Sequence, residues 1–299
     1  MSTPQPDDML TRFVFEGAAV RGALVTLTGA SRSILGGHPY PPSLQRVLAE
    51  LCSAATLLAS TLKFTGSLIV QLQGGGPVRL LVVECTDALE LRATAQWDSD
   101  RVRALGDDAT LAELAGHGVG GRLVITLDPR GAGAIYQGIV ALETASVARL
   151  VEHYLETSEQ LASRMVLVTH EGMAAGMLVQ RMPGAGSGDA AAWARASAQT
   201  AQIDPLALLQ GEAPPMRIHA LFPHDDVRVF AGKPVRSHCR CSRERVENAL
   251  RIAGRAEIES ILAERGEVEV SCEFCGRRYV LAPVEARALF AHAPESASH

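Results

Sequence analysis

The sequence is Cys-Arg-Cys at residues 239–241 and Cys-Glu-Phe-Cys-Gly at residues 272–276, and these two stretches decide how the C-terminal part of the chain folds. Thirty residues lie between the pairs, which lets four thiolates meet at one point, as a tetrahedral Zn²⁺ site requires. Gly276 can take the positive φ that closes a turn whose N–H groups point at the sulfurs. The one-residue spacer of the first pair is shorter than that of an ordinary zinc ribbon and suggests some strain. We predict that one zinc ion per chain is bound by Cys239, Cys241, Cys272 and Cys275.

Residues 236–299 are predicted to form a small zinc-binding domain around these cysteines. Ser242 is a good N-cap for a first helix that ends at Gly254, and a second helix is expected to stop near Gly266. Residues 268–272 and 279–281 have the pattern of a β-hairpin. A domain of roughly 60 residues buries little apolar surface, so its fold should depend on the metal.

Three residues outside the pairs are weaker candidates for ligands or redox groups. His238 precedes the first pair, but four thiolates already complete a tetrahedron, so an exposed imidazole is expected. Cys52 falls on a predicted helix and Cys85 ends an apolar strand, and both are interpreted as small buried side chains. The arginines near the pairs would favour thiolate over thiol; they are Arg236, Arg240, Arg243, Arg277 and Arg278.

Residues 1–182 are predicted to form an α+β domain in which helices pack on antiparallel sheets, because hairpin signals outnumber βαβ units. Apolar residues recur at three- and four-residue spacing from Leu44 to Leu62, which indicates a helix. Glycines at residues 74–76 lead into a strand and not into a helix N-terminus, so they indicate a hairpin loop and not a phosphate site. The predicted hairpins pair 66–73 with 78–85, and 123–127 with 134–140.

Residues 183–235 are predicted to be a helical linker region without a core of its own. The segment starts with a glycine-rich break at 183–188 and continues with an alanine-rich helical stretch around Trp193. A short helix is expected at 205–210. The segment is weakly apolar and broken by turns, so its order should be metastable and should come from packing against its neighbours.

Composition excludes several classes of function. The 299 residues carry a net charge of −5, and the ten arginines after residue 235 are balanced by ten glutamates, which is a poor footprint for nucleic acid. No apolar run approaches 18 residues, so we expect a cytoplasmic protein without a membrane partner. Six cysteines are too few for a disulfide scaffold. No Gly-x-Ser-x-Gly or His-Glu-x-x-His motif is present, so we do not expect an enzyme.

Over nearly its whole length the chain resembles the 33-kDa heat-shock chaperone family, the redox-regulated holdases. The most specific residues are Cys-Arg-Cys-Ser-Arg-Glu-Arg-Val at 239–246 and Cys-Glu-Phe-Cys at 272–275. Gly276 stands where the family often has Asn, and both residues tolerate positive φ. The other matching stretches are Asp8–Phe15, Val20–Gly22, Thr61–Gly66, Gln73–Gly74, Gly76–Pro77, Tyr136–Val140, Ser158–Leu161, Leu221–Phe222 and Val227–Phe230.

The resemblance implies a chaperone controlled by oxidation. It implies that the reduced, zinc-bound protein is inactive, and that peroxide with heat, or hypochlorite, expels zinc and forms the disulfides Cys239–Cys241 and Cys272–Cys275. The C-terminal region would then unfold and expose a surface that holds unfolded or oxidatively damaged client proteins without ATP. A homodimer of the oxidised form is a further expectation.

Two other functions remain open at this point. One is a zinc ribbon with a fixed metal that recruits nucleic acid or a protein partner, which the neutral charge of the module disfavours. The other is a thiol–disulfide oxidoreductase that uses Cys272 and Cys275, which lacks the thioredoxin-like βαβ context.

Overall fold

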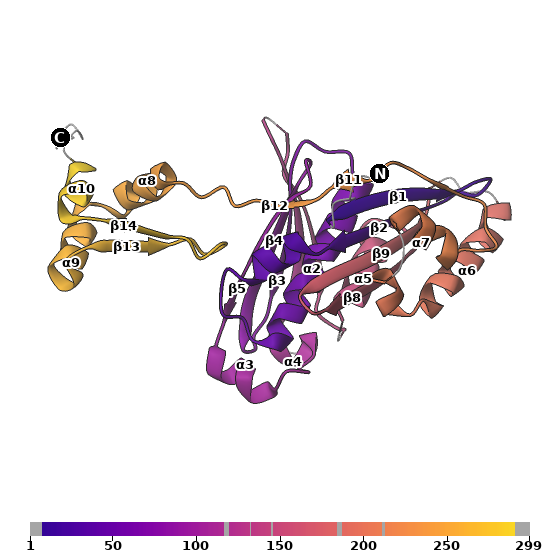
Figure 1. The fold of residues 1–299 in the computed structure, drawn as a ribbon, viewed down its shortest axis with the longest axis horizontal. Helices are drawn as coiled ribbons and strands as arrows, with labels where there is room; N and C mark the ends of the chain where they lie inside the picture. The colour runs from indigo at the N-terminus through magenta and orange to yellow at the C-terminus, as the bar shows by residue number, and fades with distance from the viewer. Residues whose placement is uncertain are drawn as a thin grey trace, which may run out of the picture. The chain divides into compact units, whose positions relative to one another are not determined.

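The computed structural model describes residues 8–116, 120–131, 133–144, 146–183, 187–210 and 213–290. The chain divides into two compact units, residues 1–238 and 239–299. The first unit contains the strands β1–β12 and the helices α1–α7, and the second contains the elements from α8 to α10 (Figure 1). The predicted boundaries at 182/183 and 235/236 stay a prediction.

One sheet of the first unit has the order β10-β1-β2-β9-β8, with β11 also paired to β1, and all its pairs are antiparallel. Its strands come from distant parts of the sequence, so the predicted linker region contributes to the same sheet as the N-terminus. The strands are β1 (Met9–Phe15), β2 (Val20–Leu27), β8 (Ser163–His170), β9 (Met173–Arg181), β10 (Val227–Val229) and β11 (Lys233–Pro234).

The other sheet has the order β12-β5-β4-β3-β6-β7, and β12 is its one parallel partner among the described residues. The predicted hairpins at 66–85 and 123–140 are confirmed. A Cβ on Gly76 would lie 2.3 Å from the backbone nitrogen of Gly116, so this loop glycine permits a close backbone approach. The strands are β3 (Gly66–Gln73), β4 (Val78–Thr86), β5 (Glu90–Trp97), β6 (Arg122–Pro129), β7 (Tyr136–Ala141) and β12 (Arg236–Ser237).

The main core of the first unit is built around α2 (Pro42–Thr61), which contacts strands of both sheets. Its apolar residues, predicted from their spacing, are buried from Leu44 to Leu58. The buried cluster around α2 takes side chains from both sheets, such as Val25 and Val83. Four more helices complete this part of the unit: α1 (Gly29–Leu35), α3 (Ser99–Leu105), α4 (Leu111–Ala115) and α5 (Val147–Thr157). The predicted α+β class with antiparallel sheets and packed helices is confirmed.

The predicted linker region covers the opposite face of the first sheet. It contains α6 (Ser187–Gln202), a 3₁₀ helix (Pro205–Leu208) and α7 (Pro214–Leu221). Phe222 is 1% exposed and its ring lies 5.0 Å from that of Phe15 and 5.7 Å from that of Phe13. Residues 184–186 of the predicted glycine-rich break lie outside the described residues, and α6 already begins at Ser187. The segment thus has order, but its apolar partners belong to β1, β2, β8 and β9.

The second unit is a small helix–hairpin domain. Its elements are α8 (Arg243–Ala253), α9 (Arg255–Arg265), β13 (Val268–Ser271), β14 (Arg278–Leu281) and α10 (Pro283–Ala288). The Ser242 side chain caps α8 by accepting a hydrogen bond from the Arg245 N–H, and Gly266 ends α9 with φ 79°, as predicted. Its core is small and is made of Val246, Leu250, Ile258, Leu262, Val268, Leu281 and Ala286. Among the described residues, no helix has both the length and the apolar character needed to cross a bilayer.

Candidate metal centre

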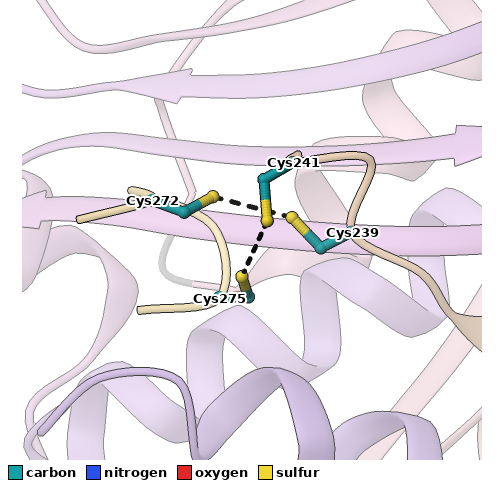
Figure 2. A group of neighbouring side chains, drawn as sticks. All are labelled: Cys239, Cys241, Cys272 and Cys275. Carbon is teal, nitrogen blue, oxygen red and sulfur yellow. Dashed lines mark hydrogen bonds between the residues drawn. The ribbon is translucent and has the colours of Figure 1, made fainter. Parts of the chain in front are cut away.

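The four clustered cysteines come from two loops of the second unit. Cys239 and Cys241 precede α8, and Cys272 and Cys275 lie in the loop between β13 and β14. That loop is closed by hydrogen bonds from the Cys272 N–H to the Arg277 carbonyl and from the Gly276 N–H to the Cys272 carbonyl, both 2.9 Å. Gly276 has φ 68°, which confirms the positive φ predicted for it. The two loops therefore bring the four side chains together (Figure 2).

The spacing of the sulfurs fits a tetrahedral metal. The four Sγ atoms all lie within 4.8 Å of one another. The Sγ atoms of Cys239 and Cys272 are 3.6 Å apart, and those of Cys241 and Cys275 are 3.5 Å apart. A Zn–S bond of about 2.3 Å gives a tetrahedron whose edges are about 3.8 Å. Four sulfur donors at this spacing suit zinc, and the arrangement could bind a metal ion.

Hydrogen bonds to the sulfurs support this arrangement. The Tyr279 hydroxyl donates to the Cys241 Sγ at 3.1 Å. The backbone N–H groups of Cys241 and Arg277 donate to the sulfurs of Cys239 and Cys275 respectively. Such donors orient the ligands of a metal site and stabilise the charged thiolate.

In the absence of a metal, the thiols differ in acidity. Burial, followed by hydrogen bonds with the other thiols, raises the pKa of Cys239 to about 12. Burial also raises the pKa of Cys241, but hydrogen bonds from Tyr279 and the neighbouring thiols outweigh it, and its pKa falls to about 7. Burial raises the pKa of Cys275. Cys241 is therefore more acidic than Cys239 and Cys275.

Two of the arginines that were expected to favour the thiolates form ion pairs with glutamates instead. Arg278 pairs with Glu269, and Arg243 pairs with Glu247 and Glu285. Arg277 lies close enough to the sulfurs of Cys241 and Cys275 for its charge to interact with theirs. The charge of Arg277 thus favours the thiolate forms of Cys241 and Cys275.

The remaining candidates lie outside the cluster. The His238 backbone N–H donates to the Leu91 carbonyl in the first unit, and this histidine is not part of the four-residue group. Cys52 and Cys85 are buried, which confirms the interpretation as core side chains. Burial raises the pKa of both thiols, that of Cys52 to about 12. Cys272 and Cys275 lie between two antiparallel strands, and among the described residues no thioredoxin-like βαβ unit surrounds them.

Tyr279 is a functional candidate that sequence reasoning placed on a strand without assigning it a role. The sequence feature that could have indicated a role is the position of Tyr279, four residues after Cys275 and at the start of the returning strand of the hairpin. We predict that Tyr279→Phe weakens zinc retention about tenfold to a hundredfold, because the removed donor stabilises the Cys241 thiolate. Competition with a chromophoric chelator measures this. Tyr136→Phe, which alters an exposed tyrosine of the first unit, is the control; equal zinc affinity in both variants would contradict the assigned role.

Comparison with known proteins agrees with these observations. A family model described as Hsp33 protein matches residues 8–282. The 33 kDa chaperonin of Chromobacterium violaceum is 44% identical over 95% of this chain and 94% of its own, and that of Methylobacillus flagellatus is 41% identical over 96% and 95%. The crystal structure of the 33 kDa chaperonin, or heat shock protein 33 homolog, of Thermotoga maritima shares the fold, with a TM-score of 0.78, 20% identity and coverage of 95% of this chain and 98% of that one.

These matches extend through both units and include the cysteine cluster at one end and β1 at the other. The relatives are named as chaperonins, which supports a chaperone role for this protein. On the match of nearly the whole chain, together with the identity to its relatives, the protein belongs to the Hsp33 family.

Proposed function

We propose that this protein is an oxidation-activated holdase that acts in the cytoplasm without ATP. The observation that carries the proposal is the set of four sulfurs within 4.8 Å of one another in a chain of the Hsp33 family. When bound there by Cys239, Cys241, Cys272 and Cys275, zinc would cross-link the two loops of the second unit. In this reduced form the protein is inactive.

Oxidation acts on the four thiolates. Formation of the Cys239–Cys241 and Cys272–Cys275 disulfides removes two electrons for each bond, and peroxide or hypochlorite accepts them. Disulfide sulfurs no longer serve as metal ligands, so the second unit loses its cross-link. The core of this unit is small, which supports the expectation that it unfolds when the cross-link is lost.

In the next step of activation, residues 183–235 lose their order and detach from the first sheet. The packing of α6, the 3₁₀ helix and α7 on β1, β2, β8 and β9 supports this step. The segment supplies few buried side chains of its own, so its order depends on its neighbours. Its release would uncover the apolar face that contains Phe13 and Phe15, and this face would hold unfolded or oxidatively damaged client proteins. The same face would promote a homodimer of the oxidised protein.

A linker variant tests the second step without oxidation. Phe222→Ala should cost about 3–5 kcal/mol of local stability, as large-to-small changes at buried aromatic sites do. We expect the reduced variant to lose hydrogen-exchange protection over 187–235 and to suppress client aggregation in part. Met216→Ala on α7, the helix that Phe222 directly follows, removes a side chain that is 58% exposed and serves as the control. Unchanged protection in Phe222→Ala would show that this ring does not hold the linker.

The whole proposal is tested by the aggregation of a thermally unfolding client. The reduced protein should leave the aggregation unaffected, and the peroxide-treated protein should suppress it without ATP. A variant with Cys272→Ser and Cys275→Ser separates the alternatives, because a metal-independent chaperone would be unaffected by it. Suppression by the reduced, zinc-loaded protein at the same level as by the oxidised protein would refute redox control.

A further inference from the structure

A cavity of about 230 Å³ opens in the first unit, on the side of the first sheet that faces α2. The helix ends at Thr61, and its last residues, Ser60 and Thr61, form one wall. Phe230, which follows β10, forms another. An engineered cavity of about 150 Å³ is enough to hold benzene, so this cavity has room for a ring-sized group and a small head group.

Strand register explains which side chains line it. Arg21 is paired with Val14 on one side and with Gln180 on the other, and Ala23 is paired with Leu178. Because directly opposite residues of paired strands point to the same face, these side chains lie together. Leu178 and Ala23 are buried and apolar, so the floor of the cavity is apolar and its rim is polar.

Two arginines at this rim have no carboxylate partner among the described residues. The Arg21 Nε and Nη2 donate to the Gln180 Oε1 at 3.2 and 3.0 Å, and Gln180 is 1% exposed. The Gln180 Nε2 in turn donates to the Ser163 Oγ at 3.1 Å. This chain of hydrogen bonds fixes the guanidinium of Arg21 at the cavity, and no acceptor among the described residues bonds its Nη1.

Within the part of the chain that the structure describes, no carboxylate forms an ion pair with Arg12 or Arg21. Arg12 lies on the neighbouring strand, diagonally across from Arg21. The two arginines therefore lie on the same face of the sheet, and burial, followed by the charge of Arg12, lowers the pKa of Arg21. The third nearby arginine, Arg228, is paired with Glu16 at 2.9 Å. An anion between Arg12 and Arg21 would remove the repulsion.

We propose that this cavity binds a small ligand with one anionic head group, a carboxylate or a phosphate, on an apolar body of about the size of an aromatic ring. The head group contacts Arg12 and Arg21, and the body packs on Ala23, Leu178 and Phe230. Arg21 is held in place before the ligand arrives, so little side-chain order is lost on binding.

Occupancy would also act on residues 183–235, and this consequence rests on the proposed function. Phe230 belongs to that segment and its N–H donates to the Arg12 carbonyl at 2.9 Å. A ligand that binds only when Phe230 is in place stabilises the ordered segment by mass action. Such a ligand would delay activation without touching a cysteine.

Calorimetric titration of the reduced, full-length protein tests the site. The probes are 3-phenylpropionate and phenyl phosphate, with the neutral 3-phenylpropanol as the uncharged control. We expect at least one anion to bind, and the alcohol to bind about tenfold more weakly or not at all. If the carboxylate binds more tightly than the phosphate, the head group is assigned as a carboxylate, and the reverse order assigns a phosphate.

Arg12→Gln should weaken binding of the anion about tenfold or more, because it removes one of the two cations. Arg101→Gln makes the same change of charge on α3, which does not line the cavity, and should leave the affinity unchanged. Failure of both anions to bind at about 10 mM, or equal affinity in Arg12→Gln and the unaltered protein, would overturn the proposal. Neither result bears on zinc binding or on oxidation, so failure of this proposal would leave the proposed chaperone function untouched.

Discussion

Replacing Cys241 by serine should remove the zinc and unfold the second unit while leaving the first unit folded. Structural zinc contributes about 10–16 kcal/mol of apparent binding free energy in small domains. A hydroxyl is a far poorer ligand than a thiolate, and the apolar core of residues 239–290 is too small to compensate. Metal content by mass spectrometry and hydrogen exchange by peptide should show both losses together.

Cys52→Ala is the matched control for this experiment. It also removes a thiol, but one that is buried in the core of the first unit. It should keep one zinc per chain and normal protection over residues 239–290. If Cys241→Ser retains its zinc and the protection of this range, the assignment of four ligands is wrong.

Oxidation should convert the four clustered thiols to disulfides and leave Cys52 and Cys85 reduced. The thiolate is the reactive species. Cys52 and Cys85 are buried in the core of the first unit, whereas the four clustered cysteines are only partly buried and accessible to an oxidant. Burial also raises the pKa of Cys52 and Cys85, which lowers their thiolate fractions. Peptide mapping after treatment with peroxide should find the two buried cysteines as free thiols.

The pairing within the cluster is the sharper part of this prediction. We expect Cys239–Cys241 and Cys272–Cys275, because a short loop costs the least entropy to close once the unit has loosened. In the folded unit, sulfur contacts of 3.6 and 3.5 Å join Cys239 with Cys272 and Cys241 with Cys275, across the two pairs. Those cross-pair bridges as the main products would show that oxidation precedes loosening. The Cys239–Cys241 bridge should be the more easily reduced of the two expected bonds, because its ring is strained.

The elements that sequence reasoning predicted have strong local signals. The helix α2 shows its apolar spacing over 20 residues, and the hairpin of β3 and β4 has a turn of three glycines and a proline. The two cysteine pairs were enough to predict the cluster, because the type and spacing of metal ligands can be read from short stretches of sequence.

The elements that it did not predict depend on distant partners. The strands β10, β11 and β12 contain two or three residues each, too few for any period to appear. They form because they pair with the edges of β1 and β5, which are distant from them in the sequence. The contact of Tyr279 with Cys241 joins residues 38 positions apart, and the position of Tyr279 on the returning strand of the cysteine hairpin does not by itself identify Cys241 as its partner.

While β10 and β11 are paired with β1, this edge of the first sheet is closed to other polypeptide chains. These two short strands cover one edge of the first sheet, with Val229 opposite Phe13 and Pro234 opposite Met9. If residues 183–235 detach, the N–H and C=O groups of β1 along that edge lose their partners. A free edge accepts any extended chain through main-chain hydrogen bonds. The uncovered protein could therefore add a strand from a damaged polypeptide whatever its side chains, because the backbone is the one feature that all such polypeptides share.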